Sequence, residues 1–373
     1  MKVRSFFYGM LCMLALGASM ASCSDDNDDD PHNDAGSTVT LPQVRAYFLN
    51  EGTMGYNNST IAFYAPNGDA DFIGDIFKEQ NGHGLGDTGQ DMIEYDDYIY
   101  VAVYGSNYLA KLNSACVELK RLSFVDDKDL QAGVRYLVAD DGYIYASFWG
   151  GVVAKINAQT LTIESKLIDL GGNLEGMVIC EDMLYVANSC TVGATTVYND
   201  EIKVIDLNTF TLKETLTVVS NPYNQMLEAE GKVFFISNDY DSVDGYVLQM
   251  IDPLHNNKVT TLGNATYIAV DGDVLYAINS ITDWDTYLAV NTFFTYNIKT
   301  GQINNASFLK NVPANLEKDL IYMLEINEYN GDIYIGTSDF STNGTIYRFK
   351  KDGTFVEDFD AGGISPNCAV FFN

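Results

Sequence analysis

The chain has 373 residues, and its 51 aspartates and glutamates outnumber its 21 lysines and arginines, so its formal net charge is −30. This charge excludes nucleic acid as a partner, because binding to nucleic acid needs lysine and arginine to neutralise the phosphates. Hydrophobic residues make up 47% of the chain and aromatic residues 13%, which suffices for one large globular domain with a packed core.

Residues 1–22 have the pattern of an export signal rather than of a membrane span. Lys2 and Arg4 precede the apolar stretch FFYGMLCMLALGA, and small residues then lead to Cys23. The sequence MASC at 20–23 resembles the lipobox of bacterial lipoproteins, in which the cysteine is acylated. We therefore predict that Cys23 is the lipid anchor of a membrane-attached protein. The alternative is an ordinary cleaved signal that leaves Cys23 free.

Residues 23–37 form an acidic segment, in which the run SDDNDDDPHNDAG is too polar to fold. We predict that they are a flexible tether between the anchor and a folded domain at 38–373. Acidic residues directly behind a lipidated cysteine resemble the signal that sends lipoproteins of Bacteroidota to the outer face of the outer membrane. This resemblance implies a surface-exposed, lipid-anchored protein of the outer membrane.

A two-strand module recurs along the predicted domain. Its first strand is read in DMIEYD (91–96), RYLVAD (135–140), EGMVIC (175–180), NQMLEA (224–229), TYIAVD (266–271), YMLEIN (322–327) and NCAVFF (367–372). Its second strand has an aromatic residue at the third position in every copy, namely Tyr47, Tyr100, Tyr145, Tyr185, Phe235, Tyr276 and Tyr334. Two further strands follow, for example STIAFY (59–64) and ADFIGDI (70–76) in the first repeat.

The two ends of the domain complete each other. RAYFLN at 45–50 is a second strand without a first strand before it, and NCAVFF at 367–372 is a first strand with nothing after it. Short strands repeating every 40 to 55 residues are typical of a β-propeller, in which each repeat forms one blade. We predict an all-β fold, a seven-bladed β-propeller of four-stranded blades. Its ring is closed by pairing of the C-terminal strand with the N-terminal blade.

The predicted domain shows no signature of catalysis. His83 and His255 are isolated from each other, no zinc-binding spacing occurs, and neither G-x-S-x-G nor G-x-x-x-x-G-K-[ST] is present. We therefore predict a protein that is not an enzyme and requires no cofactor. The oxygen-rich fragment with Asp239, Asp241 and Asp244 suits calcium, but it lacks a bidentate glutamate, so a polar turn is favoured over a calcium site.

The four cysteines of the domain form no C-x-x-C pair. These residues are Cys116, Cys180, Cys190 and Cys368. After export one disulfide is an alternative, but four thiols buried as small apolar residues are favoured.

Two sets of loops are expected to meet on one face of the ring: those that lead into the first strands and those that join the second strand to the third. The second set is rich in aromatic and amide side chains, which suit a large, flat, neutral ligand with many amides or hydroxyls. The alternative is that the loop tyrosines only cover the rim. Our predicted ligand-binding residues are Tyr56, Asn57, Tyr104, Tyr108, Arg135, Trp149, Tyr198, Asn238, Tyr240, Trp284, Tyr287 and Phe340.

The opening VRAYFLNEGTMGYNNSTIAFY, together with the Y-V-A-N strands and the D-L-N-T-F turns, resembles surface lipoproteins with YncE-like propellers from Bacteroidota. The cobalamin-capturing BtuG-type lipoproteins belong to that group. The resemblance implies a protein that binds vitamin B12 or a related corrinoid on its loop face and passes it to a TonB-dependent outer-membrane transporter. Asn50-Glu51-Gly52 matches the shared opening, whereas the predicted ligand-binding residues come from loop position alone.

Two other functions are left open by the sequence. A glycan-binding surface lipoprotein of a polysaccharide-uptake system would use the same aromatic residues as stacking platforms. A lyase or lactonase would need a metal or a basic cluster at the central channel, where Arg135 and Lys318 are the candidate basic residues. The enzyme is therefore the weakest of the three interpretations.

Overall fold

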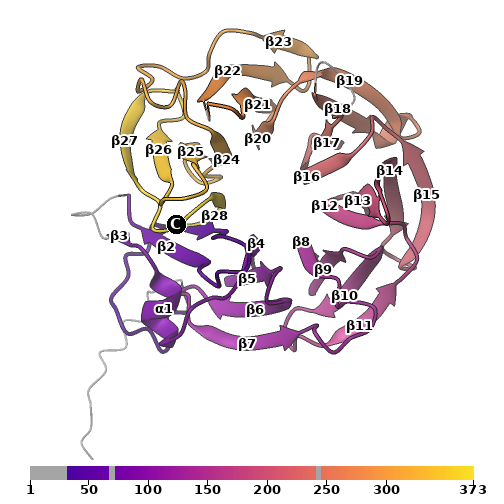
Figure 1. Cartoon of the computed structure of the whole chain (residues 1–373), viewed down its shortest axis with the longest axis horizontal. Helices are drawn as coiled ribbons and strands as arrows, with labels where there is room; N and C mark the ends of the chain where they lie inside the picture. Colours follow the sequence, from indigo (N-terminus) through magenta and orange to yellow (C-terminus); the bar gives the residue numbers. More distant parts are fainter. Residues whose placement is uncertain (1–31, 67–71, 241–244, 287) are drawn as a thin grey trace, which may run out of the picture. The chain divides into compact units, whose positions relative to one another are not determined.

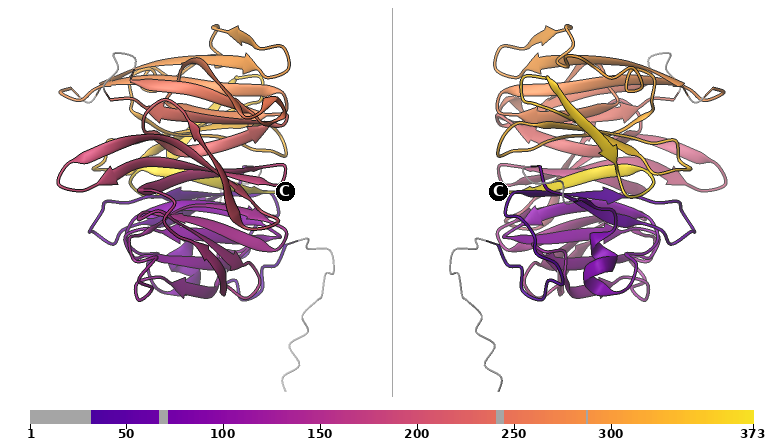
Figure 2. Two further views of the ribbon diagram at one scale, coloured as in Figure 1. Left: turned by 90° about the vertical axis from the view of Figure 1, so that its right-hand side faces the viewer. Right: turned by 90° about the vertical axis from the view of Figure 1, so that its left-hand side faces the viewer.

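The computed structural model describes residues 32–66, 72–240, 245–286 and 288–373. Within these residues, seven antiparallel four-stranded sheets are arranged as blades around a central axis (Figure 1). Side views show the strands crossing the thickness of the ring (Figure 2). The predicted all-β, seven-bladed propeller is confirmed.

We number the blades in chain order. From blade 1 to blade 7, the inner strands are β28 (Pro366–Phe372), β4 (Gly89–Tyr95), β8 (Val134–Asp140), β12 (Asn173–Cys180), β16 (Pro222–Ala229), β20 (Tyr267–Asp271) and β24 (Ile321–Ile326). The second strands are β1 (Arg45–Asn50), β5 (Tyr98–Val103), β9 (Tyr143–Phe148), β13 (Met183–Val192), β17 (Lys232–Asn238), β21 (Val274–Asp283) and β25 (Ile333–Thr337).

The remaining strands complete each blade toward its outer edge. The third strands are β2 (Thr60–Tyr64), β6 (Tyr108–Asn113), β10 (Val152–Asn157), β14 (Thr196–Asp206), β18 (Tyr246–Asp252), β22 (Leu288–Asn297) and β26 (Thr345–Phe349). The outer strands are β3 (Phe72–Ile73), β7 (Glu118–Ser123), β11 (Ile163–Leu167), β15 (Thr211–Thr217), β19 (Lys258–Asn264), β23 (Gln302–Asn304) and β27 (Phe355–Asp360). A short 3-10 helix, η1 (Pro253–His255), lies between β18 and β19.

The C-terminal strand closes the ring. β1 pairs with β2 on one side and with β28 on the other, and in the second pairing Arg45 lies opposite Phe372 and Leu49 opposite Cys368. The chain therefore ends beside the strand that opens the first blade, as the two incomplete modules predicted.

In six blades the recurring aromatic residue of the second strand faces the next blade; in blade 5, Phe234 takes this place, and Phe235 packs against blade 4. The hydroxyl of Tyr47 in blade 1 donates to the Ser114 carbonyl of blade 2 at 2.6 Å, and Tyr100 of blade 2 donates to the Ala158 carbonyl of blade 3 at 2.9 Å. The ring of Tyr145 in blade 3 lies 5.9 Å from that of Phe210 in blade 4. A large flat side chain at this position therefore fills the space between blades and can bond to the neighbour's outer turn.

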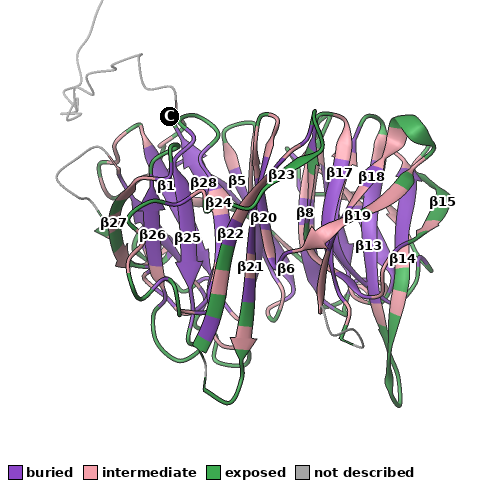
Figure 3. Cartoon of the chain, turned by 90° about the horizontal axis from the view of Figure 1, so that it is seen from above, coloured by how far each residue is buried: buried purple, intermediate pink, exposed green. Residues whose placement is uncertain are grey.

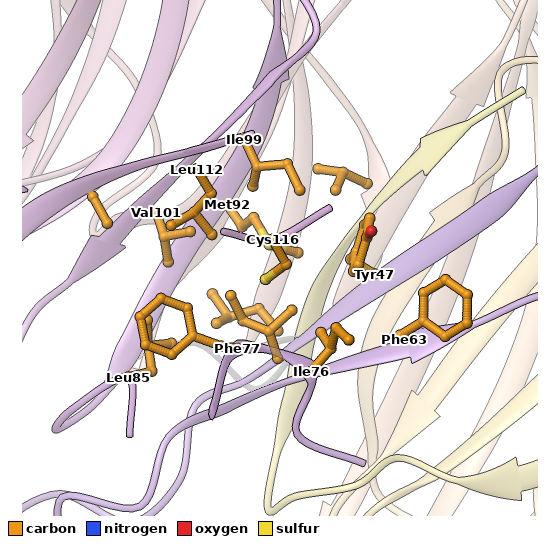
Figure 4. Close-up of a cluster of buried hydrophobic side chains, with 14 of the residues drawn as sticks. Tyr47, Phe63, Ile76, Phe77, Leu85, Met92, Ile99, Val101, Leu112 and Cys116 are labelled. Atoms are coloured by element: carbon orange, nitrogen blue, oxygen red, sulfur yellow. The ribbon is translucent and has the colours of Figure 1, made fainter. Parts of the chain in front are cut away.

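The hydrophobic core lies between adjacent blades. One cluster joins blades 1 and 2 and contains Tyr47, Phe63, Phe77, Val101 and Leu112 (Figure 4). Because neither blade can bury both of its faces alone, this packing makes the stability of each blade depend on its neighbours.

The outer edge of blade 1 differs from the prediction. ADFIGDI was expected to form a strand, but in its described part only β3 is extended, and the helix α1 (Ile76–Asn81) follows. The Asp75 carboxylate caps this helix by accepting from the Lys78 amide at 3.1 Å. Phe77 is thereby buried between blades 1 and 2, so the helix takes the place of the rest of the outer strand.

Residues 32–37 pack against the ring, although the sequence assigned them to the tether. Arg45 donates to Asp34 at 2.8 Å, Asn113 donates to the Ala35 carbonyl at 2.9 Å, and the ring of His32 lies 5.3 Å from that of Phe372. The compact unit therefore spans His32–Asn373. The predicted signal 1–22 and Cys23 lie outside the described residues.

The cysteines of the propeller are free thiols. Cys116, Cys180 and Cys368 are buried and Cys190 is half-buried, so the alternative of a disulfide among them is not realised. Burial raises the pKa of Cys180 to about 11. Within the described residues, no helix has the length and apolar character needed to cross a bilayer.

Candidate functional site

A cavity of about 360 Å³ opens on the face of the ring where the inner strands begin. We call it the loop-face cavity. Both predicted sets of loops contribute to its lining. The inner strands supply Gln90, Arg135, Tyr136, Tyr223, Tyr267, Tyr322 and Asn367, and the loops and ends of the second strands supply Met54, Trp149, Asn238, Thr282, Trp284 and Phe340.

Two long hairpins extend from the ring, and one of them contributes to this cavity. β13 with β14 and β21 with β22 extend beyond the other strands on one side of the ring, and their ends are exposed (Figure 3). Thr282 and Trp284, at the end of the second hairpin, line the cavity. The hairpins therefore enlarge the face on which the cavity opens.

Three aromatic pairs surround the loop face, each joining two neighbouring blades. Their ring centroids lie 5.0 Å apart in Tyr104–Trp149 (blades 2 and 3), 5.3 Å in Tyr198–Tyr240 (blades 4 and 5) and 6.3 Å in Trp284–Phe340 (blades 6 and 7). All six residues were predicted from loop position. Trp284 is 59% exposed, so much of its ring is available for stacking.

Arg135 is buried in the wall of the cavity and is fully engaged there. Its Nε lies 2.8 Å from Glu175 Oε2, and its Nη1 donates to the side-chain oxygen of Gln90. The guanidinium also lies 4.9 Å from the ring centroid of Trp149 and 5.1 Å from that of Tyr104, which are cation–π distances. Arg135 therefore supports the aromatic wall and does not offer a free positive charge.

Several carboxylates of the cavity were not predicted as site residues. The Tyr322 hydroxyl donates to Glu51, and burial raises the pKa of Glu51. Burial raises the pKa of Asp91 to about 7, and burial together with the charge of Asp91 raises that of Glu325 to about 8. Sequence position gave no signal for this grouping, because the three residues belong to blades 1, 2 and 7.

Asp91 and Glu325 lie where two cavities meet. A second cavity, of about 450 Å³, is lined by later residues of the inner strands, including Glu94 and Met177, and by Glu328 just after β24. Asp91 and Glu325 line both cavities. The carboxylates therefore form the base of the loop-face cavity.

The wall of the loop-face cavity also contains buried polar atoms that lack a hydrogen-bond partner within the described part of the chain. These atoms are Asn238 Oδ1, Ser280 Oγ and Asn367 Oδ1. Asn367 uses its Nδ2 to donate to the Gly89 and Gln90 carbonyls at 2.9 and 3.0 Å, so its oxygen remains an acceptor. Buried polar groups are normally paired, so these three atoms, from blades 5, 6 and 1, leave hydrogen-bonding capacity in the lining of the cavity.

Tyr108 was predicted as a ligand-binding residue, and this prediction is wrong. It is only 3% exposed, its hydroxyl donates to the Leu85 carbonyl, and the Arg121 guanidinium lies 3.9 Å from its ring centroid. Tyr108 begins β6, and its side chain belongs to the core between blades 1 and 2.

The other predicted residues lie outside the cavity lining or outside the described residues. Tyr56, 75% exposed, and Asn57 are in the loop between β1 and β2 and do not line the cavity. Tyr104, Tyr198 and Tyr240 belong to the aromatic pairs but are not part of the cavity lining either. Tyr287, Asp241 and Asp244 lie outside the described residues. In the part of the chain that is described, no group of three or more His, Cys, Asp or Glu side chains is arranged to hold a metal ion.

Comparison with known proteins finds relatives in structure only. No family model and no curated protein sequence matches the chain. A quinonprotein alcohol dehydrogenase-like protein from Bacteroides thetaiotaomicron has a TM-score of 0.63 at 15% identity, covering 89% of this chain and 78% of that protein. Hydrazine synthase from Kuenenia stuttgartiensis has a TM-score of 0.56 at 12% identity, covering 71% and 77%.

The WD40 repeats of RRP9 also match, with a TM-score of 0.53 at 11% identity over 74% of this chain and 82% of that chain. Identities this low carry information about the fold and not about ligand or activity. The chain is a seven-bladed β-propeller with Bacteroides structural neighbours.

Proposed function

We propose that this protein captures vitamin B12 or a related corrinoid on its loop face and passes it to a TonB-dependent outer-membrane transporter. The observation that carries the proposal is one cavity whose lining combines Trp149, Trp284 and Phe340 with several amide and hydroxyl side chains, on a face that also carries the Tyr198–Tyr240 pair. A corrinoid is a bulky, flat macrocycle with amide side chains, and this combination of rings and polar groups complements it.

The size of the cavity determines how such a ligand would bind. A corrinoid is larger than the cavity of about 360 Å³, so one edge would enter while the macrocycle lies across the rim. Trp284 and Tyr240, both largely exposed, are positioned to contact the part that stays outside. Because the closed ring holds the loops in place before binding, little conformational entropy would be lost.

The motif that matches the BtuG-type opening supports the same site. The Asn50 side chain donates to the Ala361 carbonyl at 2.8 Å, and the Glu51 amide donates to the Ser365 carbonyl at 2.9 Å. Gly52 has a φ of +78°, and an added Cβ would lie 2.8 Å from the Ser59 nitrogen. The motif therefore fixes the first turn of the loop and presents Glu51 to the cavity.

The attachment side of the ring is compatible with capture. Asp34 binds Arg45, which pairs with Phe372 at the end of β28 opposite to the loop face. Delivery would place the transporter against the loop face.

We propose binding rather than catalysis, with a glycan as the second candidate ligand. Arg135 is the basic residue among the described residues that line the cavity, and Glu175 already engages it. The described lining of the cavity therefore contains no unpaired lysine or arginine side chain that could take part in catalysis. Exposed rings such as Trp284 would also serve as stacking platforms for sugars, and this observation favours the glycan as the second candidate.

The test is calorimetric titration of the compact unit, His32–Asn373, with cyanocobalamin and with neutral oligosaccharides. Saturable binding of cyanocobalamin at micromolar or lower concentration is the expected result. If an oligosaccharide binds and cyanocobalamin does not, the proposed ligand would be a glycan and not a corrinoid.

A further inference from the structure

We infer that the loop-face cavity selects ligands whose inserted group donates hydrogen bonds and carries no negative charge, with Glu51 and Asn238 as specificity-determining residues. The inference rests on the proposed function, because it concerns the same site, and it narrows the chemical class of the ligand. For a corrinoid, it means that a primary amide enters the cavity and that a carboxylate in its place is rejected.

The first observation is the presence of buried hydrogen-bond acceptors without a donor in the cavity. Asn238 is 5% exposed and Ser280 6% exposed, and Asn238 Oδ1 and Ser280 Oγ find no partner among the described residues. Asn367 Oδ1 also has no partner among the described residues, while Asn367 Nδ2 donates to the Gly89 carbonyl. A buried carbonyl oxygen without a donor is costly, so a ligand N–H or O–H placed here would gain the full value of the bond.

The second observation is a set of acidic side chains that no basic side chain neutralises. Glu51, Asp91 and Glu325 line the cavity, and none of the three forms an ion pair within the described part of the chain. The positively charged side chain in the lining is Arg135, and it forms an ion pair with Glu175 at 2.8 Å. Because the pKa of Asp91 is raised to about 7 and that of Glu325 to about 8, the charge argument rests on Glu51. Burial raises the pKa of Glu51, which shows that its charge is poorly solvated.

These two observations act in the same direction on a ligand. An amide or hydroxyl group supplies donors to Asn238 Oδ1 and Asn367 Oδ1 and leaves the carboxylates undisturbed. A ligand carboxylate offers only acceptors and places a second negative charge beside Glu51 in a partly dry site, where like charges repel strongly.

Matched ligand pairs test this selectivity on the compact unit His32–Asn373. One pair is cyanocobalamin and its derivatives in which one primary amide at a time is hydrolysed to a carboxylate. The other pair is a neutral oligosaccharide and its counterpart with one uronic acid. We expect the neutral member to bind at least about tenfold more tightly, and for cyanocobalamin we expect this loss in the derivative whose inserted amide was changed.

Two variants locate the effect. Glu51→Gln should reduce the preference for the neutral ligand, whereas Glu328→Gln removes a carboxylate that lines only the second cavity and should leave the preference unchanged. Asn238→Ala should weaken binding of the neutral ligand more than binding of its carboxylate counterpart, because it removes the oxygen that would accept from the inserted amide or hydroxyl group. A merely structural asparagine would weaken both ligands equally.

The outcomes separate this inference from the proposed function. Equal affinities within a pair, or an unchanged preference in Glu51→Gln, would overturn the selectivity while leaving corrinoid capture standing. Binding of the neutral oligosaccharide alone, with rejection of its uronic acid counterpart, would overturn corrinoid capture and support the selectivity. If none of the ligands binds, both the selectivity and the proposed corrinoid capture would be overturned.

Discussion

Trp149 donates from Nε1 to Glu175 Oε1 at 2.8 Å, and this bond ties the aromatic wall of blade 3 to the inner strand of blade 4. The other oxygen of Glu175 binds Arg135, so one buried carboxylate fixes both an indole and a guanidinium. The orientation of the wall is therefore set by an ion pair that lies beneath it.

Breaking this pair should destabilise the fold. Glu175→Gln leaves Arg135 buried with its charge uncompensated, and we expect a loss of about 3–5 kcal/mol in the free energy of unfolding. Urea unfolding measures this loss. The matched control is Glu118→Gln, which removes the half-buried partner of Arg121, a pair at 2.6 Å, and should cost about 1 kcal/mol or less. Equal losses in the two variants would show that the Arg135–Glu175 pair has no special role.

Trp284→Ala should weaken ligand binding without changing stability. Its ring is 59% exposed and lies 6.3 Å from that of Phe340, so its removal leaves no cavity in the core. We expect an affinity loss of about tenfold or more, as for aromatic anchors of other interfaces. Leu254→Ala is the control, because Leu254 is 80% exposed on η1, away from the cavity lining. Unchanged affinity in Trp284→Ala would remove this rim from the binding site.

The hydroxyls of the recurring tyrosines should differ in their contribution to stability. Tyr100→Phe removes the bond to the Ala158 carbonyl and should cost about 1 kcal/mol, plus the cost of the unpaired carbonyl. Tyr334→Phe should cost less, because the Tyr334 hydroxyl is buried without a partner in the described residues. Chemical denaturation of both variants measures the difference, and a larger loss in Tyr334→Phe would contradict the role assigned to the hydroxyl.

The carboxyls at the base of the cavity should make stability depend on pH. The pKa of Asp91 is raised to about 7 and that of Glu325 to about 8, whereas in the unfolded chain both lie at about 4. Between these values the folded state binds more protons than the unfolded state, so the contribution of this pair to stability falls as pH rises from about 5 to about 8.

Variants isolate that contribution from the rest of the acidic chain. Unfolding free energies at several values between pH 5 and pH 8 should show a shallower decline in Glu325→Gln than in the wild type. Glu317→Gln, which changes an exposed carboxylate outside both cavities, should keep the decline of the wild type. A decline that is the same in all three proteins would mean that Glu325 ionises without cost.

The sequence predicted the blades well because strand periodicity and the aromatic third position are local features. It failed where the outcome depended on contacts across the fold. Asp75 caps a helix where a strand was expected. Tyr108 was expected in a loop of the ligand-binding face, but its side chain is buried in the core. The contact between Tyr322 and Glu51 joins residues 271 positions apart, and no local pattern announces it.

Ring closure gives the last prediction. β28 supplies the inner strand of blade 1, and its Val370 and Phe372 are buried in the cluster between blades 1 and 2. Deleting residues 366–373 should expose the free edge of β1 and open the ring, so we expect loss of cooperative unfolding and aggregation. Size-exclusion chromatography and circular dichroism measure these effects, with deletion of Asn373 alone, which lies beyond β28, as the control. A monomer that still unfolds cooperatively after the larger deletion would show that the propeller is held together by blade packing without its closing strand.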